Sequence, residues 1–142
     1  MFYNNNIENM NFRASFCDPF KPDVIELGDI KKDQIMELFE KTPWTEYLKK
    51  MKTAKESEIH YSPSLEIENK DNRNGLSVSA IDGLEWSIFY KRPKLVKKFF
   101  GLSEKMDNDY LTDVWGQSER DVRACLEALI KNDLQFLEDK IK

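Results

Sequence analysis

Residues 64–90 read SLEIENKDNRNGLSVSAIDGLEWSIFY, and this stretch decides the fold. Apolar side chains recur at every second position, which places them on one face of a pleated sheet. These residues are Leu65, Ile67, Leu76, Val78, Ala80, Leu84, Trp86, Ile88 and Tyr90. The pattern predicts three antiparallel strands whose other face is polar.

The length of each turn between these strands is predicted from the residues that the turn places opposite one another. A three-residue loop over 81–83 opposes Val78 to Trp86, so that apolar side chains meet apolar ones. Its glycine is free to take the left-handed conformation that such a loop needs. The longer turn at 70–75 is compatible with Ile67 opposite Val78.

The outer face of these strands carries carboxylates, hydroxyls and one aromatic ring. With two residues of the long turn, it gives the predicted partner-binding set: Glu66, Glu68, Asn72, Arg73, Ser77, Ser79, Glu85, Ser87 and Phe89. In this register Ser79 separates Glu66 from Glu85, which puts their backbones roughly 10 Å apart. That spacing admits a catalytic or metal-binding carboxylate pair, solvated surface glutamates, or a protein-binding face.

Composition indicates one globular domain with a well-solvated surface. The chain has 142 residues, of which 40% are hydrophobic, 12% aromatic and 34% charged. The net charge of -4 argues against a general nucleic-acid binder and favours a basic partner.

Neither a membrane partner nor a disulfide framework is expected. No apolar run approaches the roughly 20 residues that span a bilayer. The start MFYNNN lacks a basic leader and an apolar core, so we expect a cytoplasmic protein. Cys17 and Cys125 are too few and too far apart for a disulfide scaffold or a zinc site, so both are expected to be free thiols.

We expect residues 1–22 to form an N-terminal arm and residues 23–142 to form a single α+β domain. Pro19 and Pro22 limit regular structure in the arm, whose phenylalanines would be costly to leave in water. Part of the arm is therefore expected to dock on the domain or to supply an edge strand. A short strand is predicted over 23–27.

Two helices are predicted between this arm and the sheet. Asp29 can cap a helix that runs to about residue 41. Thr42 as cap and Pro43 at the first helical position then start a second helix. Its inner stripe consists of Trp44, Tyr47, Leu48 and Met51.

Further strands and a capped helix are predicted after residue 90. Residues 94–102 fit either a helical stripe or a strand, and a proline just before them favours a strand. An acidic loop over 104–109 precedes a strand over 110–115. Ser118 and Asp121 resemble a capping box that begins a helix. The fold class is α+β, an antiparallel meander of about four to five strands packed by two N-terminal helices and a C-terminal helix.

No motif for catalysis, a metal or a cofactor accompanies these elements. His60 is the only histidine, and no neighbouring pattern completes a triad or shares a metal. Cys125 falls on the apolar stripe of the C-terminal helix and is predicted to be a core residue. We therefore predict no catalytic residue, no metal ligand and no cofactor. A small hydrolase that uses His60 or the pair Glu66 and Glu85 is the third alternative.

Two basic segments make nucleic acid a further alternative partner. Residues 49–55 and 91–98 are rich in lysine, and Tyr90 could stack on a base if the two segments met in space. A basic strip on an acidic protein is more commonly part of a dipolar surface, so nucleic acid is disfavoured.

Three segments carry a resemblance to a known class of protein. They are SPSLE at 62–66, WSIFYKRPK at 86–94 and YLTDVW at 110–115 before the Ser118 helix. With two short helices and a strand meander, the chain resembles immunity proteins of bacterial polymorphic-toxin and contact-dependent inhibition systems. Such proteins are not enzymes, and the resemblance implies binding of a cognate protein toxin, often over its active site.

The leading interpretation is therefore a non-enzymatic immunity protein that sequesters and neutralises a toxin through its acidic sheet face. Glu66, Glu68 and Glu85 would suit a basic surface such as a nuclease cleft. The main alternative is a small accessory or adaptor domain of a mobile element that binds another protein or itself, which leaves a homo-oligomer open.

Overall fold

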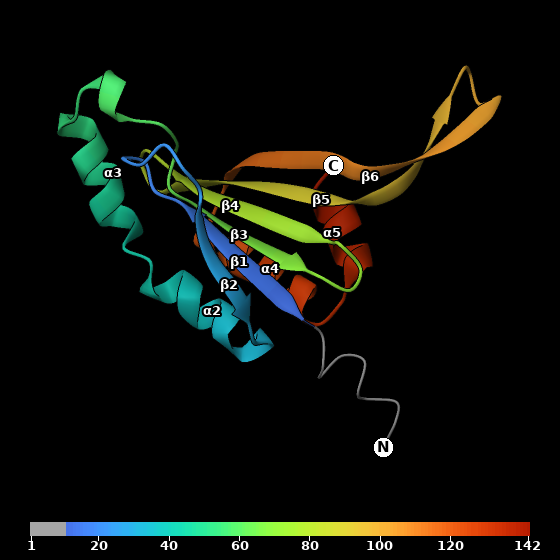
Figure 1. Ribbon diagram of the computed structural model, residues 1–142, viewed down its shortest axis with the longest axis horizontal. Helices are drawn as coiled ribbons and strands as arrows, with labels where there is room; N and C mark the ends of the chain where they lie inside the picture. Colours follow the sequence, from blue (N-terminus) through green and yellow to red (C-terminus); the bar gives the residue numbers. More distant parts are fainter. Residues whose placement is uncertain (1–10) are drawn as a thin grey trace.

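The computed structural model describes residues 11–142, which form a six-stranded antiparallel sheet packed by helices (Figure 1). The strands are β1 (Phe12–Cys17), β2 (Ile25–Ile30), β3 (Ser64–Asn69), β4 (Gly75–Ile81), β5 (Glu85–Lys98) and β6 (Ser103–Gln117), in the spatial order β2-β1-β3-β4-β5-β6. The helices are α2 (Lys32–Lys41), α3 (Trp44–Thr53), α4 (Glu119–Ile130) and α5 (Leu134–Lys140), with a short 3-10 helix η1 (Glu56–Glu58). The α+β class is confirmed, with six strands in place of the predicted four to five.

The core lies between one face of the sheet and the helices. The residues of β3, β4 and β5 that alternation places inward are buried, and only Leu84 departs from the pattern. They pack against Phe39 of α2, Trp44 of α3 and an apolar stripe on α4. That stripe consists of Val122, Cys125, Leu126 and Leu129. Cys125 is therefore a core residue, as predicted, and burial raises the pKa of its thiol to about 11.

Residues 12–17 form an interior strand, not the arm or edge strand that we expected. β1 pairs with β2 on one side and with β3 on the other. Phe12, Ala14 and Phe16 alternate inward and are buried. The two prolines that suggested an arm lie in the connection between β1 and β2. β2 begins two residues after the start of the strand predicted over 23–27, and residues 1–10 of the expected arm lie outside the described residues.

The predicted strand faces are confirmed, but both predicted registers differ from the observed ones by two residues. The loop between β4 and β5 covers 82–84, so Val78 lies opposite Ile88. In β3, Leu65 takes the position opposite Val78. A shift of two residues keeps every side chain on its face, and alternation alone therefore cannot select the register. Leu84 falls in the loop, where it has a φ of 56° and is 46% exposed.

The helices begin close to where the sequence predicts. α2 begins at Lys32 because Asp29, its predicted cap, belongs to β2. In α3 the predicted first residue, Pro43, is the N-cap. The capping box of α4 is confirmed. Ser118 Oγ accepts a hydrogen bond from the backbone N–H of Asp121 at 3.2 Å, and the Asp121 carboxylate accepts one from the backbone N–H of Ser118 at 2.9 Å.

β5 and β6 form a long hairpin whose far end projects beyond the helices (Figure 1). The pairing runs from Trp86 opposite Gln117 to Lys98 opposite Ser103. The strand alternative for 94–102 is confirmed as far as Lys98. The strand predicted over 110–115 lies within β6, and the acidic segment 104–109 belongs to the same strand and is not a loop.

Arg92 joins this hairpin to the C-terminal helix. It is only 3% exposed, and its guanidinium donates two hydrogen bonds of 2.9 Å to the carboxylate of Glu138 in α5. It also donates to Thr112 Oγ1 of β6 at 2.7 Å and lies over the ring of Tyr90. The hydrogen bonds from Arg92 lower the pKa of Glu138. These contacts fix the C-terminal end of the chain against β5 and β6.

Candidate protein-binding face

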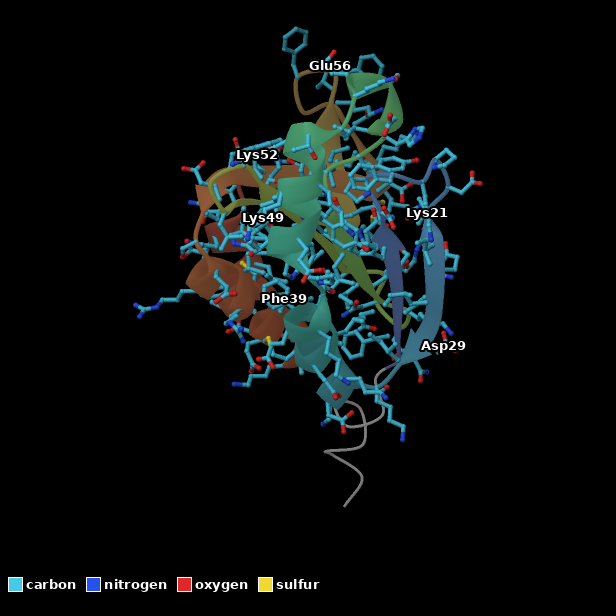
Figure 2. All side chains as sticks on the ribbon, turned by 90° about the vertical axis from the view of Figure 1, so that its left-hand side faces the viewer. Lys21, Asp29, Phe39, Lys49, Lys52 and Glu56 are labelled. Carbon is cyan, nitrogen blue, oxygen red and sulfur yellow. The ribbon has the colours of Figure 1, made fainter. Side chains whose placement is uncertain are left out.

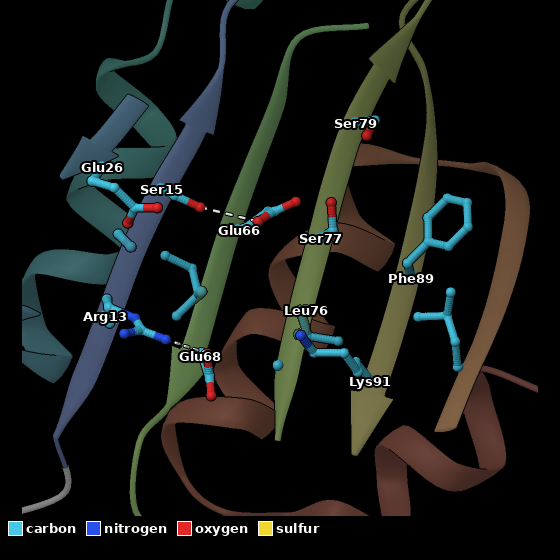
Figure 3. A pocket seen from close by; sticks show the side chains of 14 residues that line it. Arg13, Ser15, Glu26, Glu66, Glu68, Leu76, Ser77, Ser79, Phe89 and Lys91 are labelled. Carbon is cyan, nitrogen blue, oxygen red and sulfur yellow. Dashed lines mark hydrogen bonds and ion pairs between the residues drawn. The ribbon is translucent and has the colours of Figure 1, made fainter. Parts of the chain in front are cut away.

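The sheet face opposite the core carries an open hollow of about 590 Å³, shown from close by in Figure 3. Its lining comes from all six strands. We define the open face as the lining residues whose side chains carry its chemistry: Arg13, Ser15, Glu26, Glu66, Glu68, Ser77, Ser79, Phe89, Lys91 and Leu111. Because the described helices pack on the other side of the sheet, a partner can approach these side chains.

Strand pairing arranges the open face in rows. One row runs Glu26, Ser15, Glu66, Ser77 and Phe89, and the next runs Arg13, Glu68, Gly75 and Lys91. Gly75 has no side chain, which leaves space between Glu68 and Lys91. Added there, a Cβ would lie 3.3 Å from the carbonyl oxygen of Ile67, a close contact that would require the β3 backbone to shift by a few tenths of an ångström.

The carboxylates of the open face differ in whether a neighbouring positive charge pairs with them. Arg13 Nη2 lies 3.0 Å from Glu68 Oε2 in an ion pair between β1 and β3. Ser15 Oγ donates a hydrogen bond to Glu66 Oε2 at 3.0 Å. Glu66 and Glu26 are both exposed, on either side of Ser15 (Figure 3). This side of the hollow can therefore accept a cation from a partner.

The opposite side of the hollow is aromatic and aliphatic. The ring of Phe89 meets that of Trp115 edge-on, with 5.8 Å between centroids and 77° between planes. Trp115 is 59% exposed, and Leu111, four residues before it on β6, is also exposed. Rigid aromatic side chains of this kind carry much of the energy in protein interfaces.

Small buried side chains close one end of the open face. Ser79 and Ser87 are both buried, and Ser79 Oγ lies 2.6 Å from Ser64 Oγ. Cys17 is a buried free thiol at the same end, and its pKa is raised by burial and by the charge of Glu66. Ser87 therefore lies out of a partner's reach, whereas Ser79 marks the margin of the hollow.

The structure brings five of the predicted partner-binding residues together in the hollow: Glu66, Glu68, Ser77, Ser79 and Phe89. The other four lie elsewhere. Ser87 is buried, and Glu85 is exposed at the start of β5, outside the hollow. Asn72 and Arg73 belong to the loop before β4, where the Asn72 amide donates to Asn132 Oδ1 at 3.0 Å.

Sequence reasoning missed half of the open face: Arg13, Ser15, Glu26, Lys91 and Leu111. Arg13 and Ser15 fell in the segment assigned to an arm, although the alternation of Phe12, Ala14 and Phe16 would have placed them outward. Lys91 was assigned to a basic cluster, yet it continues the outward alternation of β5.

The proposed catalytic groups do not come together. Glu66 lies within the hollow and Glu85 outside it, so the predicted row in which Ser79 separates them does not form. His60 is exposed in the segment before β3 and does not line the hollow. Over residues 11–142, no group of three or more His, Cys, Asp or Glu side chains could hold a metal ion.

The two lysine-rich segments lie at opposite ends of the molecule. Lys49 and Lys52 point outward from α3 (Figure 2), whereas 91–98 runs along β5 into the projecting hairpin (Figure 1). Tyr90 is buried, its hydroxyl donates to Asn74 Oδ1, and burial raises its pKa to about 12. The ring cannot stack on a base, so the arrangement expected for nucleic-acid binding is absent from the described residues.

The chain matches no protein-family model, no curated protein and no solved structure. None of the helices within residues 11–142 is long and apolar enough to cross a membrane.

Proposed function

We propose that the protein is a non-enzymatic binding domain that engages another protein through its open face. The observation that carries this proposal is a hollowed sheet face with exposed carboxylates on one side and exposed apolar side chains on the other. Strand pairing holds the backbone beneath these side chains in place. Binding to such a preorganised surface costs less ordering entropy than binding to a mobile loop.

The side chains of the open face define what the partner must present. Glu26 and Glu66 suit a lysine or arginine side chain, and Phe89 with Trp115 suits an apolar one. The exposed pair of Arg13 and Glu68 can rearrange toward a partner at small cost, because such pairs contribute at most about 1 kcal/mol. The fitting partner is a protein with a basic surface and an apolar anchor.

Within this class, we propose an immunity protein that sequesters and neutralises a cognate bacterial toxin. The net charge of -4 and the carboxylates of the open face favour a basic toxin surface such as a nuclease cleft, and opposite charges accelerate encounter. The segments that resemble immunity proteins fall on the elements that build the open face. Residues 62–66 lead into β3, 86–94 lie in β5 and 110–115 lie in β6. The proposed place of action is the cytoplasm of the cell that makes the toxin.

Affinity capture from cells that produce the protein, read by mass spectrometry, tests this proposal. We expect the tagged wild type to recover a toxin or a toxin-domain protein in stoichiometric amount. The double variant Glu26→Lys/Glu66→Lys should then bind the purified partner at least about tenfold more weakly in calorimetry, because it places like charges against the basic surface.

Glu85→Lys is the matched control, since it reverses an exposed charge on β5 outside the hollow. Its affinity should equal that of the wild type. Equal affinity of the double variant would remove the open face from the proposal. Recovery of no toxin, with the protein self-associated or bound to another protein, would favour the accessory or adaptor alternative.

A further inference from the structure

The far end of the β5–β6 hairpin exposes a cluster of large apolar side chains. Residues 99–102 read FFGL and connect the two strands; we call them the hairpin tip. Phe99 is 74% exposed, Leu102 is 87% exposed and Phe100 is fully exposed. The hairpin tip lies away from the helices and from the open face (Figure 1). Within the described chain these side chains have no part in the core.

The backbone of the hairpin tip does not suit its residues. Phe99 and Phe100 have φ values of 53° and 60°, in the left-handed region that disfavours residues with a Cβ. Glycine or asparagine would form such a turn more easily. Gly101 N and Leu102 N nonetheless donate to the carbonyls of Lys98 and Phe99 at 3.2 and 3.1 Å, which closes the turn. Turn formation therefore does not explain two phenylalanines here.

Positive charge borders the hairpin tip. Lys97 and Lys98 end the pairing on β5, and Lys105 lies opposite Val96 on β6. One carboxylate, that of Glu104, falls within the same stretch. Three ammonium groups against one carboxylate leave this end of the hairpin with a net charge of about +2 at neutral pH.

The acidic body does not cancel this charge. Lys98 lies six positions after the buried Arg92, which is about 20 Å of extended strand. The Debye length at physiological ionic strength is about 8 Å, so the charge of the body is strongly screened at the hairpin tip. An approaching surface meets the lysines and the apolar tip first.

We propose that the hairpin tip inserts into the surface of an anionic lipid bilayer. The lysines lie one to three residues behind the tip, or about 3–10 Å along the strands, which matches the depth to which interfacial segments bury their apolar side chains. The phenylalanines and Leu102 enter the acyl boundary while Lys97, Lys98 and Lys105 meet anionic headgroups. A convex tip on an extended hairpin suits a deformable surface, which needs no complementary pocket. This inference replaces the expectation that no membrane is a partner, which rested on the absence of a spanning segment, and it is independent of the open face.

Co-flotation of the purified protein with lipid vesicles tests the proposal. The wild type should bind vesicles of phosphatidylcholine with phosphatidylglycerol and should bind pure phosphatidylcholine far more weakly. Phe99→Ser/Phe100→Ser should reduce binding to the anionic vesicles by about tenfold or more. Lys97→Gln/Lys98→Gln should reduce it by about thirtyfold, at the usual contribution of each juxtamembrane lysine, and should remove most of the preference for anionic lipid.

Trp115→Ser is the matched control, because it removes an exposed aromatic ring of the same strand pair away from the hairpin tip. Its vesicle binding should equal that of the wild type, and circular dichroism should show all variants folded. Absence of wild-type binding to anionic vesicles would overturn the proposal, as would equal binding of the Phe99→Ser/Phe100→Ser variant. A wild-type dimer that this variant converts to a monomer would assign the hairpin tip to a second copy of the chain instead.

Discussion

Trp86 is the residue around which the aromatic part of the core is built. Its ring centroid lies 5.0 Å from that of Trp44 and 5.3 Å from that of Phe39, and the residue is 1% exposed. Within residues 11–142 its buried indole N–H has no hydrogen-bond partner. Packing of the ring therefore accounts for the contribution of Trp86 to stability, and the unpaired N–H reduces that contribution.

Replacing Trp86 should destabilise the protein strongly. Trp86→Ala leaves a large cavity and should lower the free energy of unfolding by about 3–5 kcal/mol, measured by urea denaturation. Trp115→Ala removes the same side chain from an exposed position and should change stability by less than about 1 kcal/mol. Identical unfolding midpoints for wild type and Trp86→Ala would show that the strand faces are inverted.

Asp121 makes stability depend on acid pH. Hydrogen bonds from the Ser118 backbone and from Lys140 lower the pKa of Asp121 to about 2. An aspartate in an unfolded chain has a pKa of about 3.9, so between these values the unfolded chain binds the extra proton. The stabilisation is present above about pH 4 and is lost as pH falls to about 2. In Asp121→Asn, the free energy of unfolding should fall less over this range than in the wild type; an equal fall would refute the assignment.

At the scale of elements, the contact between Arg92 and Glu138 fixes α5 to β5. Glu138→Ala leaves the buried guanidinium without its carboxylate and should cost about 2–3 kcal/mol in chemical denaturation. Lys94→Ala removes the more exposed 3.3 Å contact with the same carboxylate and an exposed cation–π contact with Tyr110, and it should cost no more than about 1 kcal/mol. Equal costs for the two variants would show that burial of Arg92 is not what makes this contact important.

The faces of the strands and the start of α4 could be predicted because local patterns determine them. Alternation fixes which side chains point inward, and the Ser118 capping box depends on residues three positions apart. Register is different, because it depends on which residue closes the turn. Leu84 adopts a left-handed φ that its side chain disfavours, and no local sequence pattern predicts this conformation.

The open face was harder to predict because distant segments build it. Arg13 and Glu68 are 55 positions apart, and their ion pair exists only because β1 inserts between β2 and β3. Prolines after β1 concealed that strand, and Arg13 and Ser15 were missed with it. Single-sequence patterns report which face a side chain occupies and say little about which strands become neighbours.

For the molecule as a whole, the net charge of -4 and the carboxylates Glu26 and Glu66 of the open face predict salt-dependent association with a basic partner. The association rate should fall as ionic strength rises, because screening weakens the attraction that accelerates encounter. Glu26→Lys/Glu66→Lys should flatten this dependence in stopped-flow measurements, whereas the control Glu85→Lys, outside the hollow, should keep the wild-type rate and salt dependence. A rate that is independent of salt for the wild type would contradict a basic partner surface.

Hydroxyl-radical footprinting of the captured complex would locate the partner on the molecule. Phe89, Leu111 and Trp115 react readily with hydroxyl radicals, and they lie on or beside the open face, while Phe100 and Leu102 of the hairpin tip serve as exposed internal references. Partner binding should protect the first three and leave the two references reactive. Protection confined to the hairpin tip, with Phe89, Leu111 and Trp115 unchanged, would contradict the open face as the protein-binding surface.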